Sequence, residues 1–193
     1  MSKRIAVLSA AAFGALALTA LVVAPVSAQD KMKSEMSGER TVMVGGAAMF
    51  PSKNIIQNAV NSKDHTTLVA AVKAAGLVET LEGKGPFTLF APTNAAFGKL
   101  PAGTVDNLVK PENKPTLTKI LTYHVVPGRL EASSLTDGRK LKTVEGEELT
   151  VHAAGGKVTI VDAKGGSSTV TIPNVNQSNG VIHVVDTVLM PAS

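Results

Sequence analysis

Cysteine and tryptophan are both absent from the 193 residues of this chain. Without cysteine the chain cannot form a disulfide, a thiolate zinc site or a cysteine nucleophile, and it cannot be acylated at an N-terminal cysteine. Aromatic residues amount to 3%, with one tyrosine and five phenylalanines. A folded core must therefore be built mainly from valine, leucine, isoleucine and alanine, and a valine-rich core favours β-structure.

Clusters of basic residues are also missing. The chain carries 19 lysines and arginines against 15 acidic residues, which gives a formal net charge of +4. Proteins that bind nucleic acid concentrate basic residues on one face and often add aromatic side chains that stack on bases. Neither feature is present, so we expect no nucleic acid among the partners of this protein.

Familiar catalytic motifs are absent as well. The sequence contains no Gly-x-Ser-x-Gly turn, no His-Glu-x-x-His helix and no glycine-rich phosphate loop followed by lysine. The histidines His65, His152 and His183 show no spacing typical of metal ligands. We therefore predict a protein that is not an enzyme, with no catalytic residues, no cofactor and no metal site.

The N-terminus has the layout of a secretory signal peptide over residues 1–28. Lys3 and Arg4 precede an apolar stretch, and Val26-Ser27-Ala28 places small residues where a signal peptidase cleaves. An uncleaved membrane anchor is the alternative, because about 20 apolar residues can span a bilayer. The small-residue site favours cleavage. The sequence therefore predicts an exported protein, periplasmic or extracellular, that is not membrane-embedded after cleavage.

Residues 29–49 are expected to form a flexible linker, because they show no sustained hydrophobic period. Four of the six methionines lie here, at Met32, Met36, Met43 and Met49. Thioethers can bind Cu(I), but the methionines form no tight cluster and no histidine lies beside them. The globular domain is expected to occupy residues 50–193.

Helical spacing dominates the first half of that domain, and short apolar runs separated by turn residues dominate the second. The expected helices cover 54–63, the segment between Asp64 and Gly76, 93–97, 104–109 and 115–123, with one strand at 87–91. The expected later strands cover 140–144, 149–152, 158–162, 169–172 and 181–189. Residues 181–185 are apolar at nearly every position, which is typical of a strand covered on both faces. The layout predicts an α+β fold.

Three ordered segments resemble motifs of the fasciclin (FAS1) domain family. Residues 85–97 (GPFTLFAPTNAAF) resemble its first box, 179–191 (NGVIHVVDTVLMP) its second, and 123–128 (YHVVPG) its Tyr-His motif. The resemblance covers about residues 50–191. With a single domain, the chain resembles the small exported bacterial members of the family. It implies a β-wedge or sandwich of two sheets with helices packed on one side.

The resemblance also implies an adhesion-type function and a set of partner-binding residues. In animal members the Tyr-His motif with its aliphatic neighbours is implicated in integrin binding. Here this set is Leu121, Tyr123, His124, Val125 and Val126. A structural role is the alternative, in which the tyrosine ring packs in the core and the histidine bonds a backbone carbonyl or the turn after the first box.

One departure from the family concerns a second recognition site. Some animal members have an Asp-Ile pair before the second box, where this chain has Asn174-Val175. The other motif residues are expected to be structural: Phe90, Pro92, Thr93, Asn94 and Phe97 in the first box, and Asn179, Gly180, His183 and Asp186 in the second. Pro92 would end a strand, Thr93 would cap a helix, and Asn179-Gly180 would form a turn at positive φ.

The hypothesis drawn from the sequence is an exported adhesion or protein-interaction module of the fasciclin type, without catalysis. Its partner would be a protein or glycan on a cell or matrix surface. The alternative is a periplasmic protein that binds a small ligand or polysaccharide in a cleft of the wedge, because barrel-like domains can hold ligands in their mouths.

Overall fold

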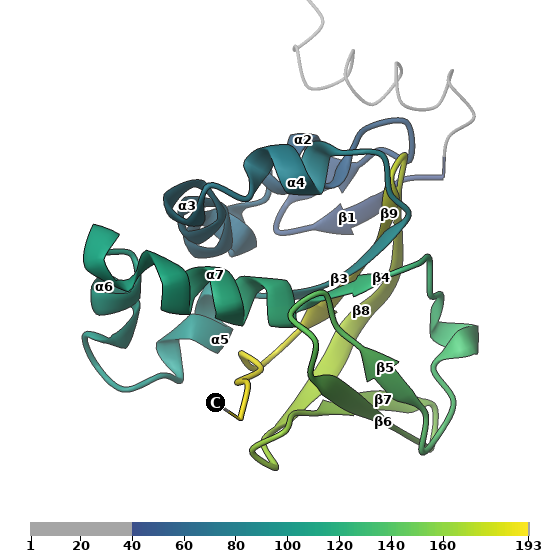
Figure 1. Cartoon of the computed structure of the whole chain (residues 1–193). Helices are drawn as coiled ribbons and strands as arrows, with labels where there is room; N and C mark the ends of the chain where they lie inside the picture. Colours follow the sequence, from purple (N-terminus) through teal and green to yellow (C-terminus); the bar gives the residue numbers. More distant parts are fainter. Residues whose placement is uncertain (1–39, 193) are drawn as a thin grey trace, which may run out of the picture. The chain divides into compact units, whose positions relative to one another are not determined.

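The computed structural model describes residues 40–192 (Figure 1). The predicted signal peptide, residues 1–28, lies outside the described residues, as does the first half of the predicted linker. Within the described range, no helix is both long enough and apolar enough to cross a membrane.

The second half of the predicted linker is folded, which corrects the boundary at residue 50. Strands β1 (Val42–Val44) and β2 (Ala47–Met49) pair as an antiparallel hairpin. Gly45 and Gly46 form its two-residue turn at φ of 57° and 76°, a conformation that glycine adopts without steric cost. Val44 and Met49 are each 3% exposed, so this hairpin belongs to the core of the domain.

Capping side chains define where the short helices begin. Asn54 Oδ1 accepts a hydrogen bond from Gln57 N–H, and Gln57 Oε1 accepts one from Asn54 N–H, which forms a capping box. The helices are α2 (Ile55–Ala59), α3 (Thr66–Ala75), α4 (Val78–Glu82), α5 (Asn94–Gly98), α6 (Thr104–Leu108) and α7 (Lys114–Tyr123), with 3-10 turns at Lys63–His65, Pro111–Asn113 and Ala132–Ser134. The helix expected over 54–63 is shorter than predicted, and α4 is not among the expected helices.

The large sheet contains seven of the described strands in the order β4-β3-β9-β8-β7-β6-β5. Their bounds are β3 Phe87–Pro92, β4 Val125–Pro127, β5 Lys140–Lys142, β6 Glu148–Ala154, β7 Lys157–Val161, β8 Ser167–Gln177 and β9 Gly180–Val185. β3 and β9 run parallel, and the other neighbours are antiparallel. The sheet is nearly closed, because Val144 N–H beyond β5 donates to Val125 O of β4 at 2.8 Å. Strand β4 is not among the strands expected from the sequence.

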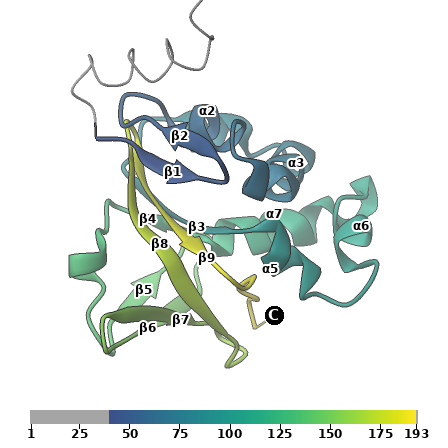
Figure 2. The same ribbon diagram turned by 180° about the vertical axis from the view of Figure 1, so that it is seen from behind.

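Strands β3 and β9 lie at the centre of the domain and separate two apolar clusters. Leu89 and Ile182 face the cluster formed with the helices, whereas Phe90 and Val185 face the cluster enclosed by β5, β6 and β7. Figures 1 and 2 show these strands between the helices and strands β5, β6 and β7. All six residues of β9 are buried, which confirms the predicted strand covered on both faces.

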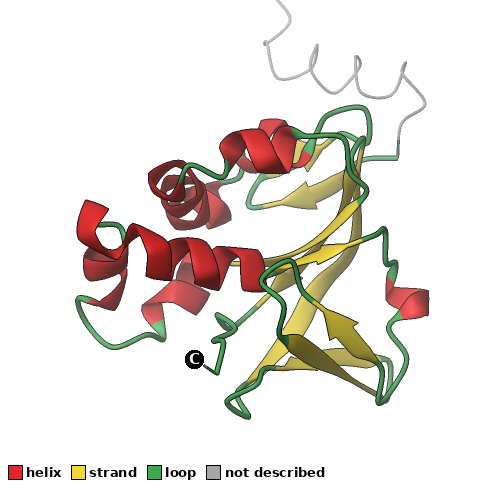
Figure 3. Cartoon of the chain, viewed as in Figure 1, coloured by secondary structure: helices red, strands yellow, loops and turns green. Residues whose placement is uncertain are grey.

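The helices gather on one side of the strands, with helical elements early in the chain and most strands late (Figure 3). The predicted α+β class with two sheets, one large and one small, is therefore confirmed. Side chains on alternate positions of a strand point to opposite faces, so a strand between two apolar layers must be apolar throughout.

Candidate functional site

The residues predicted to contact a partner around the Tyr-His motif are all buried. The exposed fractions are 4% for Leu121, 0% for Tyr123, 1% for His124, 5% for Val125 and 3% for Val126. They lie where α7 ends and β4 begins, between both apolar clusters. This burial favours the structural alternative, and direct contact of these side chains with a partner stays a prediction.

Tyr123 holds a loop against the end of α7. Its hydroxyl accepts a hydrogen bond from Ala163 N–H at 2.9 Å and donates one to Glu148 O at 3.3 Å. Burial raises the pKa of this phenol. Its ring lies in the cluster formed with β5, β6 and β7, so Tyr123 joins α7 to these three strands.

His124 uses both ring nitrogens inside the core. Nδ1 donates to Ile120 O at 2.8 Å, and Nε2 accepts from Leu189 N–H at 3.0 Å. Burial lowers the pKa of His124 to about 4, so the imidazole is neutral at physiological pH. Of the two contacts expected in the structural alternative, the bond to a backbone carbonyl is present at Ile120 O, and the bond to the turn after the first box is not. The backbone O of His124 accepts from Phe90 N–H.

The first box positions helix α5 against the start of α3. Thr93 Oγ1 accepts from Ala96 N–H and caps α5. Asn94 Oδ1 accepts from Thr67 N–H at 3.0 Å, and its Nδ2 donates to Lys63 O at 2.8 Å. Asn94 thus links two helices that are distant in the sequence.

Aromatic and apolar residues of the first box belong to the core. Phe97 is buried at 8% exposure, and Phe90 stacks on the imidazole of His183 with ring centroids 5.7 Å apart. Pro92 is the last residue of β3. Its missing N–H is suited to a strand end, where the ladder stops.

His183 and Asp186 of the second box have structural contacts. His183 Nε2 donates to Leu130 O at 2.7 Å, and burial lowers its pKa. Asp186 accepts from Thr169 N–H at 2.9 Å and lies 3.7 Å from the ammonium of Lys99. The bond to Thr169 holds β8 beside the end of β9.

The pair Asn174-Val175 is also part of the framework. Val175 is 1% exposed, and Asn174 has a φ of 55° within the irregular part of β8. Asn174 Oδ1 accepts from Ala132 N–H at 2.7 Å. Asparagine tolerates this left-handed conformation better than most residues, which gives the position a local structural reason.

Asn179 joins the second box to two helices and to the first box. Its Oδ1 accepts from Ile55 N–H at 3.1 Å, and its Nδ2 donates to Leu81 O at 2.7 Å and Gly83 O at 3.1 Å. Its backbone O accepts from Phe87 N–H at 3.0 Å. This junction orders the end of β8, the start of α2 and the end of α4.

The predicted positive-φ turn at Asn179-Gly180 requires correction. The turn occupies Ser178 and Asn179, and neither Asn179 nor Gly180 has a positive φ. Gly180 is needed for another reason, because a Cβ there would overlap the carbonyl group of Phe87. Gly85 likewise lies against the backbone of Asn179. Two glycines therefore allow β3 and β9 to begin in close contact.

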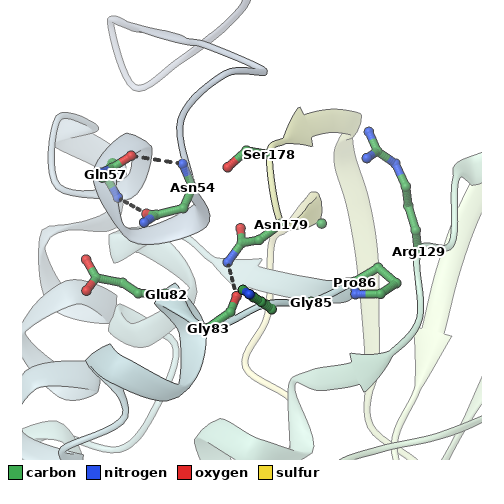
Figure 4. Close-up of a pocket in the computed structure, with 11 residues that line it drawn as sticks. Asn54, Gln57, Glu82, Gly83, Gly85, Pro86, Arg129, Ser178 and Asn179 are labelled. Atoms are coloured by element: carbon green, nitrogen blue, oxygen red, sulfur yellow. Dashed lines mark hydrogen bonds between the residues drawn. The ribbon is translucent and has the colours of Figure 1, made fainter.

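An open cleft of about 460 Å³ lies above this junction (Figure 4). It is lined by residues from the start of α2, the segment between α4 and β3, the segment after β4 and the β8–β9 turn: Asn54, Gln57, Glu82, Gly83, Lys84, Gly85, Pro86, Arg129, Ser178, Asn179 and Gly180. Most of these residues are polar or glycine. The cleft is the candidate functional site.

No sequence pattern predicts this cleft. Its walls come from four segments that are separated in the chain, and nothing in their individual patterns predicts that they meet. The sequence feature that could have indicated the cleft is the position of Gly85-Pro86 and Asn179-Gly180 at the starts of the two boxes. Among residues 40–192, no group of three or more His, Asp or Glu side chains is arranged to hold a metal ion.

The fold is similar to a solved FAS1 domain pair from the insect cell adhesion molecule Fasciclin I, with a TM-score of 0.65 and 19% identity. The likeness covers 73% of this chain and 52% of that two-domain chain, and at this identity it shows the fold. The family model of the fasciclin domain matches residues 63–191. The chain therefore belongs to the fasciclin domain family.

Two relatives extend over most of the chain. The protein sll1483 of Synechocystis sp. is 46% identical over 177 residues, which cover 91% of this chain and 95% of the relative. The cell surface glycolipoprotein MPB83 of Mycobacterium bovis is 39% identical over 153 residues, which cover 77% of this chain and 64% of the relative. The resemblance read from the three motifs is thereby confirmed.

Proposed function

We propose that this protein is an exported or cell-surface-associated adhesion or protein-interaction module that acts by binding and not by catalysis. Family membership supports this proposal, since fasciclin domains occur in adhesion and surface proteins. A relative named as a cell surface glycolipoprotein and the predicted signal peptide over residues 1–28 support export. The partner would be a protein or glycan on a cell or matrix surface.

The observation that supports a binding site is the cleft above Asn179. It is open and polar, and both family boxes contribute to it through Gly85 and Asn179. The Tyr-His residues contribute to the framework instead, because their side chains are in the core. We therefore place partner contact at the cleft and its rim, with the Tyr-His motif holding the fold in shape.

An attachment assay tests this function. Beads coated with residues 29–193 are applied to bacterial and host cells and to matrix components, with heat-unfolded protein as the background. Native beads should attach, and a coat carrying Arg129→Glu should attach less, since Arg129 lines the cleft and is exposed. Lys164→Glu in the β7–β8 turn makes the same charge change away from the cleft. Equal attachment of native and unfolded beads would contradict the adhesion function.

The second candidate function is a small-ligand or polysaccharide binder. The cleft volume of about 460 Å³ favours it, because pockets that hold small molecules measure roughly 300–1,000 Å³. A ligand that binds the folded state alone raises the melting temperature. A thermal-shift screen with glycans, lipids and small metabolites that found no shift would count against this candidate.

A further inference from the structure

The amide side chains of Asn54 and Gln57 offer donors at the cleft, because each oxygen already accepts a hydrogen bond whereas the nitrogens donate none within residues 40–192. The capping box of α2 uses Asn54 Oδ1 and Gln57 Oε1 as acceptors from backbone N–H groups at 2.8 and 3.1 Å. The nitrogens Asn54 Nδ2 and Gln57 Nε2 form no hydrogen bond within the described part of the chain. Each carries two N–H groups that remain available to a ligand.

The floor of the cleft is formed by a side chain that is fixed by its own hydrogen bonds. Asn179 Oδ1 is engaged by Ile55 N–H, and its Nδ2 is engaged by the carbonyls of Leu81 and Gly83. A side chain held by three hydrogen bonds does not turn to meet a ligand. The floor is therefore rigid, and recognition falls to the groups on the rim.

Two cations complete the donor set. Lys84 and Arg129 line the cleft and are exposed. Arg129 Nη2 donates to Asn176 Oδ1 at 2.6 Å, which restrains the guanidinium while its remaining N–H groups stay available. Glu82 is the single carboxylate among the lining residues, so cations exceed anions at this site.

We infer that the cleft binds a uronate-bearing saccharide, an inference that rests on the proposed binding function and names its ligand class. Amide N–H groups, an ammonium and a guanidinium all require acceptor oxygens from the ligand, and the last two favour a carboxylate. Sugar hydroxyls accept from the amides and donate to Glu82 or the Ser178 hydroxyl. The ligand thus pairs a negative charge with many oxygens.

A saccharide suits the cleft better than a peptide does. Protein contacts depend on buried aromatic and large aliphatic side chains at their centre. Pro86 is the sole apolar side chain among the lining residues, and no aromatic side chain is present there. A volume of about 460 Å³ accommodates a ligand of a few sugar rings, in the range of small-molecule sites.

Substitutions in the capping box can preserve the fold while they weaken ligand binding. Asn54→Asp keeps an oxygen that caps α2, since aspartate caps as well as asparagine does. Gln57→Glu keeps an oxygen for Asn54 N–H, as in the usual capping box. Each replaces a donor with a negative charge, which the N-terminus of a helix tolerates well. Melting temperatures should therefore stay equal to the native value or rise.

Calorimetry with α-1,4-linked trigalacturonate measures the effect. Native protein should bind it, and each capping-box variant should bind about tenfold more weakly or worse, because an N–H donor to a sugar oxygen is lost and a charge like that of the ligand is added. The double variant Lys84→Gln/Arg129→Gln should lose binding further. Lys157→Gln/Lys164→Gln removes the same charge from exposed positions outside the cleft and should bind as native protein does.

Ligand controls separate the sources of binding. The methyl ester of trigalacturonate has the same rings without charge and should bind at least about tenfold more weakly. Galacturonate monomer distinguishes a site for one free sugar acid from a site for a polymer chain. Affinity for the trimer should fall as salt rises, since exposed charges are screened. Equal binding of acid and ester, or unchanged binding by Asn54→Asp, would overturn the inference.

The outcome also separates this inference from the proposed function. Beads that attach to cells while trigalacturonate fails to bind would leave the adhesion function standing and would reject the uronate ligand. Beads that fail to attach while the trimer binds with the expected variant pattern would support the inference and favour the ligand-binding alternative. Absence of both would reject both.

Discussion

His124 Nε2 accepts a hydrogen bond from the backbone N–H of Leu189 at 3.0 Å, which joins the end of α7 to the C-terminal segment. The opposite nitrogen donates to Ile120 O at 2.8 Å within α7. This arrangement requires the neutral tautomer with its proton on Nδ1. The Tyr-His motif is therefore a joint between the helical layer and the end of the chain.

Replacing His124 with alanine should lower the free energy of unfolding by about 2–4 kcal/mol, because Leu189 N–H loses its partner inside the core and a cavity forms. Chemical denaturation measures the change. His152→Ala is the matched control, since His152 is exposed, and its effect should stay within about 0.5 kcal/mol. Equal effects for the two variants would contradict the structural role of His124.

Acid should destabilise the fold before most carboxylates titrate. Burial lowers the pKa of His124 to about 4 from 6.5, and burial also lowers the pKa values of His65 and His183. Since the unfolded chain takes up these protons first, the stability is fully present above pH 6.5 and is lost as the pH falls toward 4. For His124 alone the loss is about 3 kcal/mol.

Denaturation curves measured between pH 8 and pH 4 test this pH dependence. His124→Gln removes one of the titrating groups, so its stability should vary less steeply with pH than that of the native protein. The two remaining buried histidines should preserve part of the slope. A variant with the native slope would show that His124 is not protonated on unfolding in this range.

Gly180→Ala should destabilise the domain by about 1–3 kcal/mol or more, because the added methyl group overlaps the backbone of Phe87 between two central strands. Gly98→Ala is the control: Gly98 lies in α5, and a Cβ there meets nothing within 4 Å. Alanine favours helix, so this variant should be neutral or more stable by up to about 1 kcal/mol. Thermal unfolding of both variants checks the difference, and a neutral Gly180→Ala would contradict the close approach.

Asn179→Asp should lower the free energy of unfolding by about 2–4 kcal/mol. The substitution preserves the shape of the side chain but replaces a donor to Leu81 O and Gly83 O with a carboxylate oxygen that repels both. Asn107→Asp makes the same chemical change at an exposed position in α6. If denaturation gave the same small effect for both, the Asn179 junction would not stabilise the fold.

Local sequence signals account for much of this fold. The apolar run at 181–185 predicts a strand covered on both faces, and Thr93 predicts the start of a short helix. The hairpin at 42–49 escapes prediction because its strands are too short to show a period, although Gly45-Gly46 marks its turn. Helix α4 is missed for the same reason, as five residues hold little periodicity.

The candidate site was harder to predict than the fold. The Tyr-His residues attract attention as a motif, yet whether a motif side chain is exposed depends on which elements cover it. The sequence predicts that Asn179 is a turn residue. Its hydrogen bonds to Ile55 and Leu81, however, join residues that are about a hundred positions apart in the chain. Hydrogen bonds of this kind leave no local pattern.

The sequence by itself determined the family, the α+β class and the order of helices and strands, because short motifs, capping residues and hydrophobic periods act over a few neighbouring positions. Tertiary structure alone decided that Tyr123 and His124 are in the core and that residues near Asn54, Lys84, Arg129 and Ser178 meet around one cleft. The reason is physical: burial and cleft formation depend on how β3 and β9 pair and on what then packs over them, and no single segment contains that information.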